Sequence, residues 1–406
     1  MYNIKLENYV PKPMPATSDR IVAAHYYAAW KKGAAEIHGA FDDLHDYPER
    51  TPLMGYYDEE NPTVTDYEIK WAVEHGINCF IYCWYRRRSN EGQPVTVDAL
   101  RCPHAIHEGL FRAKYQNMIN FAIMYENFPR WGGTDKRDLV ENLMPFWTET
   151  YFKRENYLKI DNKPVLFVCD KNRLNGSFAS AEEQREAFDA CREFARSQGF
   201  DGLIIAACLW KDNIVNADEY NELATRGYDF HFGYNCGCSP EKSYPSDEEM
   251  IAAQCEMLKK RLAPDPMRHI PTATCFRDPT PRTTEHWNSM GFDFGKQTVF
   301  YLTPDGFRTT IRKMKEIADA LPDGAWGKRI FMIDNWNEWD EGHYVSPSHE
   351  FGFRYLQAIR EELTARDNLP DYRTPQDVGI TGLNKSWEIP DMTEASERRL
   401  KKLSKI

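Results

Sequence analysis

The chain lacks the short motifs that define several large enzyme classes. Its 406 residues contain no G-x-S-x-G nucleophile elbow, no phosphate-binding loop and no G-x-G-x-x-G fingerprint. Serine hydrolases built on that elbow, kinases and dinucleotide enzymes are therefore excluded. A surplus of basic residues is also missing, because the formal net charge is −11. This balance argues against a nucleic-acid or anionic-membrane partner, since both favour a basic surface.

Long apolar runs and a leader segment are absent as well. No apolar run approaches the length that crosses a bilayer, and no basic stretch followed by an apolar one opens the sequence. We therefore expect no membrane insertion and a cytoplasmic location, with the protein acting as a monomer or weak oligomer. A signal segment removed ahead of residue 1 would instead make the protein periplasmic or secreted.

The ten cysteines match no disulfide framework and no zinc pattern. Several lie inside apolar runs and are interpreted as reduced core thiols, namely Cys79, Cys83, Cys169, Cys208 and Cys275. Neither His104-x-x-His107 nor Cys236-Gly-Cys238 has further ligands at metal-site spacing. The oxygens of Asp334, Asn335, Asn337, Asp340 and Glu341 could face calcium, but their spacing is not that of an EF-hand loop. The sequence therefore predicts no metal and no cofactor.

What the chain does contain is a regular alternation of short β-rich apolar runs and longer segments with helical periodicity, which is typical of βα units. The eight expected strands are Ile21–Tyr27, Ile77–Trp84, Met118–Tyr125, Pro164–Cys169, Gly202–Leu209, Asp229–Tyr234, Ile270–Phe276 and Arg329–Ile333. The clearest helices are Thr65–His75, Ala181–Gln198, Ala217–Arg226 and Pro304–Leu321, and Ser246 marks the start of another. Eight units without a break in composition predict a single (β/α)8 TIM barrel with long βα loops and a C-terminal extension.

The expected domain organisation follows from this count. Residues 1–20 form an N-terminal extension, residues 21–365 form the catalytic barrel, and residues 366–406 form a tail that packs on the barrel or is partly mobile. Lys32–Val64 is long for a loop and contains Gly39, Pro48 and Pro52. Because βα loops at the C-terminal face carry the specificity of such barrels, we expect this segment to form a wall of the active site.

The residues at the expected strand ends are mainly aromatic, carboxylate, amide and arginine. Aromatic faces stack on the C–H faces of sugar rings while Asn, Asp and Arg bind hydroxyl groups, so the mixture favours a carbohydrate ligand, an oligosaccharide or polysaccharide. The candidate sugar-binding residues are Tyr26, Tyr27, Trp30, Trp84, Tyr85, Glu126, Asn127, Trp131, Trp210, Tyr234, Asn235, Arg277, Asp278, Arg282, Asn335 and Asn337. Each single aromatic, taken alone, is also compatible with simple core packing.

The most informative stretch is Asp334-Asn-Trp-Asn-Glu338-Trp-Asp-Glu341-Gly342, directly after an apolar strand. A strand sends residues i and i+3 to opposite faces, so the two glutamates converge only if the chain turns near Trp339. Gly342 permits the unusual dihedrals that such a turn needs. Two carboxyl groups at a strand end are what glycoside cleavage requires, one protonated and one ionised. Glu338 and Glu341 are therefore the candidate catalytic pair.

With these motifs in place, the chain resembles the glycoside hydrolase family 99-like proteins, which include the WbsX-type glycosyltransferase domain of polysaccharide gene clusters. The resemblance rests on motifs spread over residues 20–365. They include Tyr26-Tyr27 with Trp30, Leu53-Met-Gly-Tyr-Tyr57, His75-Gly-Ile-x-x-Phe-Ile-Tyr-x-Trp-Tyr85, Glu126-Asn127, Asp278-x-Thr-Pro-Arg282 and Asn335-x-Asn-Glu-Trp-x-Glu-Gly342. The resemblance adds Tyr57 to the candidate sugar-binding residues.

The resemblance implies a (β/α)8 barrel and retaining cleavage of α-mannosidic linkages. By position, Glu338 would act as a base on the 2-hydroxyl of the sugar, giving a 1,2-anhydro sugar, and Glu341 would act as acid and then base. The chain departs from the family pattern at Asp340 and Arg277, which bears on the sugar more than on the chemistry. Two alternatives stay open: a glycosyltransferase or transglycosylase of surface-polysaccharide synthesis, and a non-catalytic sugar-binding barrel.

Overall fold

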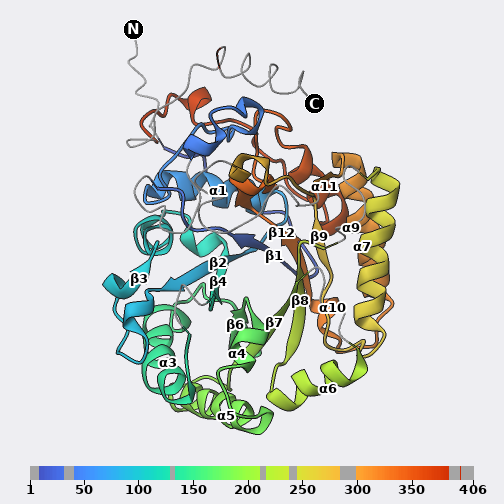
Figure 1. Cartoon of the computed structure of the whole chain (residues 1–406). Helices are drawn as coiled ribbons and strands as arrows, with labels where there is room; N and C mark the ends of the chain where they lie inside the picture. Colours follow the sequence, from blue (N-terminus) through green and yellow to red (C-terminus); the bar gives the residue numbers. More distant parts are fainter. Residues whose placement is uncertain are drawn as a thin grey trace.

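Eight parallel strands wrap around a common axis to form the predicted (β/α)8 barrel (Figure 1). The computed structural model describes residues 9–31, 41–128, 133–210, 216–236, 245–283, 299–383 and 394. The barrel strands are β1 (Ile21–Tyr26), β2 (Cys79–Arg86), β4 (Asn120–Tyr125), β6 (Lys163–Val168), β7 (Ile204–Trp210), β8 (Phe230–Tyr234), β9 (Thr272–Thr274) and β12 (Ile330–Asp334). Seven of the predicted strands each correspond to one of them, with ends displaced by a few residues, and the seventh predicted strand only partly matches β9.

The barrel closes between β8 and β9, where regular pairing is reduced to a single bridge. The amide of His231 donates to Arg268 O at 2.7 Å, and the amide of Ile270 donates to His231 O at 2.9 Å. One step further along, Gly233 N donates to the hydroxyl oxygen of Thr272 at 2.9 Å. These bonds complete the circle, since every other neighbouring pair of barrel strands has a parallel ladder.

The seventh predicted strand, Ile270–Phe276, is wrong as a single element. The structure divides it into β9 and a separate short strand, β10 (Phe276–Arg277), which pairs antiparallel with β11 (Phe300–Tyr301). The ring of Phe276 stacks on Tyr301 with centroids 5.6 Å apart. The chain therefore leaves the barrel before Phe276 to form a small hairpin-like sheet beside the C-terminal ends of the strands.

Helices surround the barrel, and their starts follow from the sequence. The longer ones are α1 (Pro62–Glu74), α5 (Ala181–Ser197), α6 (Ala217–Arg226), α7 (Asp247–Leu262), α9 (Pro304–Asp319) and α11 (Arg354–Leu363), and the short ones are α2 (Lys136–Asp138), α3 (Met144–Trp147), α4 (Lys171–Asn175) and α10 (Trp326–Arg329). Ser246 caps α7 in a reciprocal capping box with Glu249, as expected. Helix α1 begins before the predicted Thr65 because Asn61 accepts from Thr63 N and Pro62 occupies the first turn.

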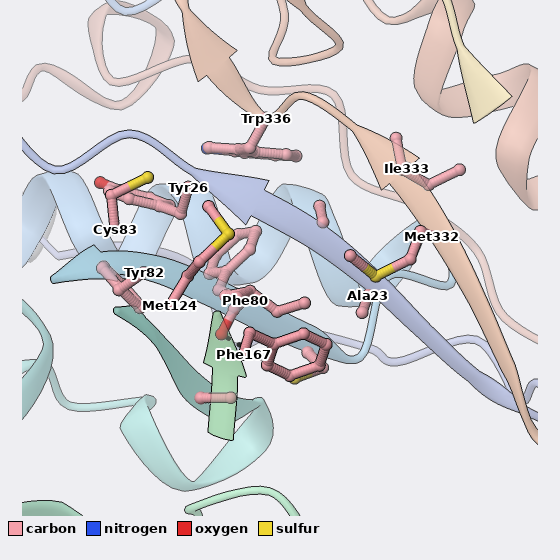
Figure 2. Close-up of a cluster of buried hydrophobic side chains, with 14 of the residues drawn as sticks. Ala23, Tyr26, Phe80, Tyr82, Cys83, Met124, Phe167, Met332, Ile333 and Trp336 are labelled. Atoms are coloured by element: carbon pink, nitrogen blue, oxygen red, sulfur yellow. Dashed lines mark hydrogen bonds between the residues drawn. The ribbon is translucent and has the colours of Figure 1, made fainter. Parts of the chain in front are cut away.

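Large side chains pack on both faces of the barrel strands, inside the barrel and between the strands and α1. Figure 2 shows Tyr26 on β1 beside Phe80 and Tyr82 on β2, on the face toward α1, whereas Ala23 on β1 and Met332 on β12 belong to the opposite face. The rings of Tyr26 and Tyr82 lie 4.3 Å apart, and Trp336 lies 4.9 Å from Phe80 at the end of the barrel where β12 stops. Packing on both faces of the strands holds the strand ends, and the side chains that follow them, in fixed positions.

Segments outside the strand and helix count lie against the barrel. In the described part of Lys32–Val64, residues 41–64, the short helix η1 (Phe41–Leu44) contacts the turn that carries the glutamates, and Arg50 of η2 (Pro48–Arg50) reaches Gly342 at the end of that turn. Residues 9–20 and 364–383 both contact α1. Examples are Ala16 N to Val73 O at 2.9 Å and Asp371 N to the Glu74 carboxylate at 2.9 Å. Within the described residues, no helix has the length and apolarity to cross a membrane.

Candidate active site

The two candidate catalytic glutamates lie directly beyond the end of β12. After Asp334 the chain forms β13 (Asn337–Glu338), one turn of 3-10 helix, η13 (Trp339–Glu341), and β14 (His343–Tyr344), which pairs antiparallel with β13. The 3-10 turn at Trp339 is the turn that the sequence requires, because it brings positions i and i+3 to one side. A carboxylate oxygen of Glu338, one of Glu341 and a ring nitrogen of His343 all lie within 4.8 Å of one another.

Glu338 is held by two donors on one oxygen. The phenol of Tyr234, at the end of β8, donates to Glu338 Oε2, and Asn335 Nδ2 donates to the same oxygen at 3.1 Å. Burial raises the pKa of Tyr234 well above its usual value, and Glu338 raises it further, so the phenol stays neutral and donates. Donors on a carboxylate favour its ionised form. Glu338 is only 5% exposed, so these contacts fix its orientation.

Glu341, unlike Glu338, lies beside an arginine. Arg277 on β10 places Nε 3.5 Å from Glu341 Oε2, and both side chains are largely buried. The guanidinium favours the ionised form of Glu341, whereas the second carboxylate within 4.8 Å favours the protonated form. These opposing influences suit a group that has to give up a proton and take it back in one reaction cycle.

Behind Glu341 lies a buried ion pair that fixes the turn. Arg50 on η2 donates to the carboxylate of Asp278 and, through Nη1, to Asp278 O at 2.8 Å. The amide of Asp278 donates to Glu341 O at 2.8 Å, and Tyr301 also donates to the Asp278 carboxylate. Burial alone would raise the pKa of Asp278, but Arg50 and these hydrogen bonds hold it below its usual value. Asp278 thus supports the loop that carries Glu341.

Gly342 is required where η13 ends. Its backbone is left-handed, with φ +52°, and a β-carbon there would lie 2.7 Å from Asp278 O and 2.9 Å from Arg50 Nη1. Any side chain would therefore collide with the ion pair. The close approach of the Arg50–Asp278 pair to the glutamate turn depends on this residue having no side chain.

Asn337 and Trp30 join β13 to the end of β1. The amide of Asn337 accepts from Tyr27 N at 2.8 Å and donates to Tyr27 O and to a Glu59 oxygen, each at 3.0 Å. The indole of Trp30 donates to Asn337 O at 2.9 Å. Burial raises the pKa of Glu59 well above its usual value, although the hydrogen bonds from Trp30 N, Tyr26 and Asn337 oppose this shift. These contacts position the glutamate turn from the β1 side.

A second buried cluster lies between the end of β1 and helix α1, which carries Glu68. Tyr26 donates to Glu68 Oε2 at 2.6 Å, and the indole of Trp336 donates to Glu68 Oε1 at 3.1 Å. Burial, with Glu59 nearby, raises the pKa of Glu68 to about 8. Trp339 donates to the hydroxyl of Tyr57 at 2.9 Å. Tyr26 and Tyr57 therefore have their hydroxyl groups bonded within the protein, and the cluster supports the turn from the α1 side.

Glu126 directly follows β4, on another side of the same mouth. Burial raises its pKa to about 7, although the thiols of Cys169 and Cys83 oppose this shift by hydrogen bonding. The pKa values of Cys83 and Tyr85 are raised first by burial and then by the charges of both Glu126 and Glu338. Cys83 and Tyr85 thus lie within electrostatic range of both carboxyl groups, so Glu126 belongs to the same set of strand ends.

The remaining candidates are placed as follows. Asn127 exchanges hydrogen bonds with the backbone of Asp170 at 2.8 and 3.0 Å. Trp84 donates to Tyr151 at 3.0 Å and is buried among aromatic rings, whereas Trp210 is partly exposed with its ring edge against Tyr234. The amide of Asn235 donates to Asp334. Trp131 lies outside the described residues, as does the side chain of Arg282, whose backbone belongs to a 3-10 helix (Thr280–Thr283).

Sequence reasoning missed several residues that hold the site. Arg50, Glu59, Tyr301 and His343 were not among the candidates, and Asp334 was considered only as a calcium ligand. Arg50 and Asp278 are 228 positions apart, so no local pattern connects them. His343 follows Gly342 directly, and a polar residue at a turn carries no signal of its own. The one available signal was His25, a polar residue within an apolar strand, which bonds to Asp334 at 3.1 Å.

Among the residues that the structure describes, one group has the spacing to hold a metal ion, namely Glu338, Glu341 and His343. Burial alone would lower the pKa of His343, but Asp334, followed by Glu338 and Glu341, raises it above its usual value. A protonated imidazole is a poor metal ligand, because binding requires the neutral ring. The three groups also lie close enough to one another to exchange protons with a bound ligand.

The fold and these strand ends define a (β/α)8 barrel with a carboxylate pair at its C-terminal mouth. Residues 133–359, more than half of the chain, match the family described as Glycosyltransferase WbsX. The chain belongs to this WbsX family. Two curated proteins, both named Uncharacterized protein WxcX, from Xanthomonas campestris pv. campestris strains ATCC 33913 and B100, are each 21% identical over 394 residues. The match covers 90% of this chain and 52% of theirs, so the chain spans about half the length of these relatives.

Solved structures with the same fold include the GH99 endo-alpha-mannosidase from Bacteroides thetaiotaomicron. It superposes with a TM-score of 0.57 at 15% sequence identity, covering 85% of this chain and 97% of that chain. The same enzyme in complex with BIS-TRIS-propane gives the same TM-score and identity. At this identity the likeness shows the barrel fold alone, and it agrees with the fold expected from the family 99-like resemblance.

Proposed function

We propose that this protein is a glycoside hydrolase that cleaves an α-mannoside or a related glycan with retention of configuration. The observation that carries the proposal is the convergence of Glu338 and Glu341, which have oxygens within 4.8 Å of each other. Inverting enzymes hold their carboxyl groups about 6.5–9.5 Å apart to leave room for water, whereas retaining enzymes use a shorter spacing. The different surroundings of the two glutamates support different roles for them.

In the proposed reaction Glu338 removes the proton from the 2-hydroxyl of the bound sugar. The 2-oxygen attacks the anomeric carbon as the bond to the leaving oxygen breaks, and Glu341 protonates that oxygen. This first step gives a 1,2-anhydro sugar as an intermediate. Water then attacks the anomeric carbon while Glu341 takes its proton, and Glu338 returns a proton to the 2-oxygen. An internal nucleophile gains a large proximity advantage, so the protein supplies two proton transfers.

The described strand ends supply groups for holding a sugar. Tyr234 and Asn335 orient the base through Glu338 Oε2. Trp210, partly exposed beside Tyr234, offers a ring for stacking. Glu126, with a pKa raised to about 7, can donate or accept a hydrogen bond near neutral pH. Within this proposal, Asp278 and Asn337 act by positioning the loop, because they bond to neighbouring parts of the protein.

A second candidate function is glycosyl transfer, and the name of the matching family favours it. The same carboxylate pair would serve a transglycosylase if an acceptor sugar replaced water in the second step. A transferase that uses a nucleotide sugar would instead need a site for a diphosphate. Incubation with a nucleotide sugar and an acceptor distinguishes these reactions, because only the last one consumes the nucleotide sugar.

The test of the proposed function is product analysis on a panel of α-mannosides and bacterial surface glycans. We expect new reducing ends with the wild-type chain and none with Glu338→Gln. A substrate methylated at the 2-hydroxyl of the sugar that is cleaved should not react. A 2-deoxy-2-fluoro analogue should leave no covalent adduct on Glu338. Such an adduct would contradict the anhydro-sugar mechanism. Binding of glycans without any cleavage would instead support the alternative of a non-catalytic sugar-binding barrel.

A further inference from the structure

His343 is anchored beneath the carboxylate pair by Asp334. Its Nε2 lies 2.8 Å from the main-chain carbonyl oxygen of Asp334 and 3.3 Å from the Asp334 carboxylate. A carbonyl oxygen only accepts hydrogen bonds, so Nε2 carries a hydrogen. The other ring nitrogen, Nδ1, gains a proton only when the ring becomes an imidazolium. When His343 changes its charge state, the proton is therefore gained or lost at Nδ1.

That nitrogen faces the candidate base. Nδ1 of His343 lies 3.9 Å from Glu338 Oε2, the oxygen that also accepts from Tyr234 and Asn335. The side chain of His343 is fully buried, so solvent screens the interaction little. A neutral ring would place a lone pair toward the carboxylate, whereas an imidazolium would place a charged N–H there.

The charged and titratable neighbours of His343 come from four elements. Asp334 lies at the end of β12, Glu338 on β13 and Glu341 on η13, and all three favour the cationic ring. The ring of Tyr234, on β8, lies 5.4 Å away in an edge-on arrangement. Asp334 is itself held as an anion by several donors, namely His25, Thr274, His343 and the amide of Asn235.

The pKa of Asp334 supports this chain of charges. Burial alone would raise it, but His343 and the hydrogen bond from His25 hold it far below its usual range. An anion is therefore fixed on the far side of the ring from Glu338. The imidazole lies between two carboxylates, and each stabilises its positive charge.

From this geometry we propose that His343 is a positioning residue whose imidazolium, held by Asp334, keeps Glu338 in the carboxylate form. The inference rests on the proposed function for its consequence, because a base must be ionised to take a proton from the 2-hydroxyl. It assigns a role to a residue outside the glutamate pair. It also gives a structural reason why Glu338, and not Glu341, acts as the base. Tyr234, Asn335 and His343 all lie around Glu338 Oε2 and favour its ionised form.

The first test is the pH profile of kcat/KM for His343→Gln. Glutamine can still donate to Asp334 O but carries no charge. Because an opposite charge at this range lowers a carboxyl pKa by about one to three units, the acid limb of the profile should move up by about that amount. The alkaline limb, set by Glu341, should move up by a smaller amount, because Glu341 also interacts with the ring but Glu338 interacts with it more strongly. A loss by the same factor at every pH would show that His343 is only a packing residue.

The chain offers a matched control in His75. This histidine is equally buried and bonds through Nδ1 to a main-chain carbonyl, Trp71 O, at 2.7 Å. It lies at the end of α1, with Phe353 and Tyr372 against its ring. His75→Gln removes a comparable ring and should leave the acid limb where it is. An equal shift in both variants would overturn the proposal.

The second test needs neither activity nor a folded His343 variant. Nitrogen NMR of histidine-labelled protein, with the His343 ring assigned through its contact to Tyr234, should show both ring nitrogens protonated at neutral pH. Glu338→Gln should lower the pH at which this ring titrates. A ring that is neutral at pH 6, or one whose titration ignores Glu338→Gln, would overturn the inference. A protein that cleaves no glycan but shows the expected titration would refute the proposed function alone.

Discussion

Replacing Gly342 by alanine tests how closely the ion pair and the glutamate turn are packed. Gly342 has φ +52°, and an added β-carbon would lie 2.7 Å from Asp278 O and 2.9 Å from Arg50 Nη1. Both neighbours are held in place, since Arg50 Nη1 bonds to Asp278 O at 2.8 Å and Asp278 N bonds to Glu341 O at 2.8 Å. The turn therefore has to move if a methyl group is added.

The expected size of the effect has two parts. A left-handed backbone costs an alanine about 1–2 kcal/mol. Forcing a methyl group into a packed site adds about 1–3 kcal/mol, so Gly342→Ala should lower the free energy of unfolding by about 2–5 kcal/mol. Unfolding entropy scales with chain length, so for 406 residues each kcal/mol lowers the melting temperature by roughly 1 °C. The predicted shift is about 2–5 °C.

Gly352 supplies the matched control. Its φ is +54°, nearly identical, but nothing lies within 4 Å of an added β-carbon. Gly352→Ala should therefore show only the backbone cost, about 1–2 °C. Glycoside cleavage should fall by about 100-fold in Gly342→Ala, because a shift of about 1 Å in a catalytic group has that effect, and should be retained in Gly352→Ala. Equal melting temperatures with equal activities would refute the packing argument.

Three further predictions concern the groups around the pair. Arg50→Met should lower the free energy of unfolding by about 3–5 kcal/mol, because it leaves Asp278 buried without its cation. In urea titrations, the double variant Arg50→Met/Asp278→Asn should lose less stability than the two single variants lose together. Additive losses would contradict the proposed coupling between the two residues. The pKa of Glu68 is raised to about 8 by burial and by Glu59, so its stabilising effect is present below about pH 4.5 and is lost as the pH rises through about 8. Melting curves should show this loss in the wild-type chain and a flatter profile in Glu68→Gln; identical profiles would remove Glu68 as the cause. Glu341→Gln should abolish cleavage of glycosides with poor leaving groups yet spare those with an activated phenol, since an easily departing phenolate needs little protonation; equal loss on both substrates would assign Glu341 another role.

The barrel could be predicted from the sequence because its signals are local. Strands buried on both faces appear as short apolar runs, such as β2, all of whose residues are buried. Capping residues and glycines in the sequence indicated where helices begin and end, as at Ser246 and Gly227. The split of the seventh strand could not be foreseen, because it depends on Phe276 pairing with Tyr301 across the chain.

The site was predictable only in part. The spacing of Glu338 and Glu341 with a following glycine indicated a turn, and the 3-10 turn at Trp339 brings both carboxyl groups together. Residue type at a strand end, however, does not tell whether a side chain faces a ligand or the protein. Asn337 and Trp84 have their polar groups bonded within the protein, to Tyr27 and to Tyr151. Such partners lie far away in the sequence, so only the folded chain reveals them.

The most direct measurement of the central claim is a proton NMR time course of the anomeric signal released from an α-mannoside whose leaving group is an unactivated sugar. We predict that the wild-type chain first releases the α anomer, with slow mutarotation afterwards, and that Glu338→Gln and Glu341→Gln each abolish the early signal. First release of the β anomer would contradict the retaining mechanism. Unchanged release by either variant would contradict the claim that Glu338 and Glu341 form the catalytic pair.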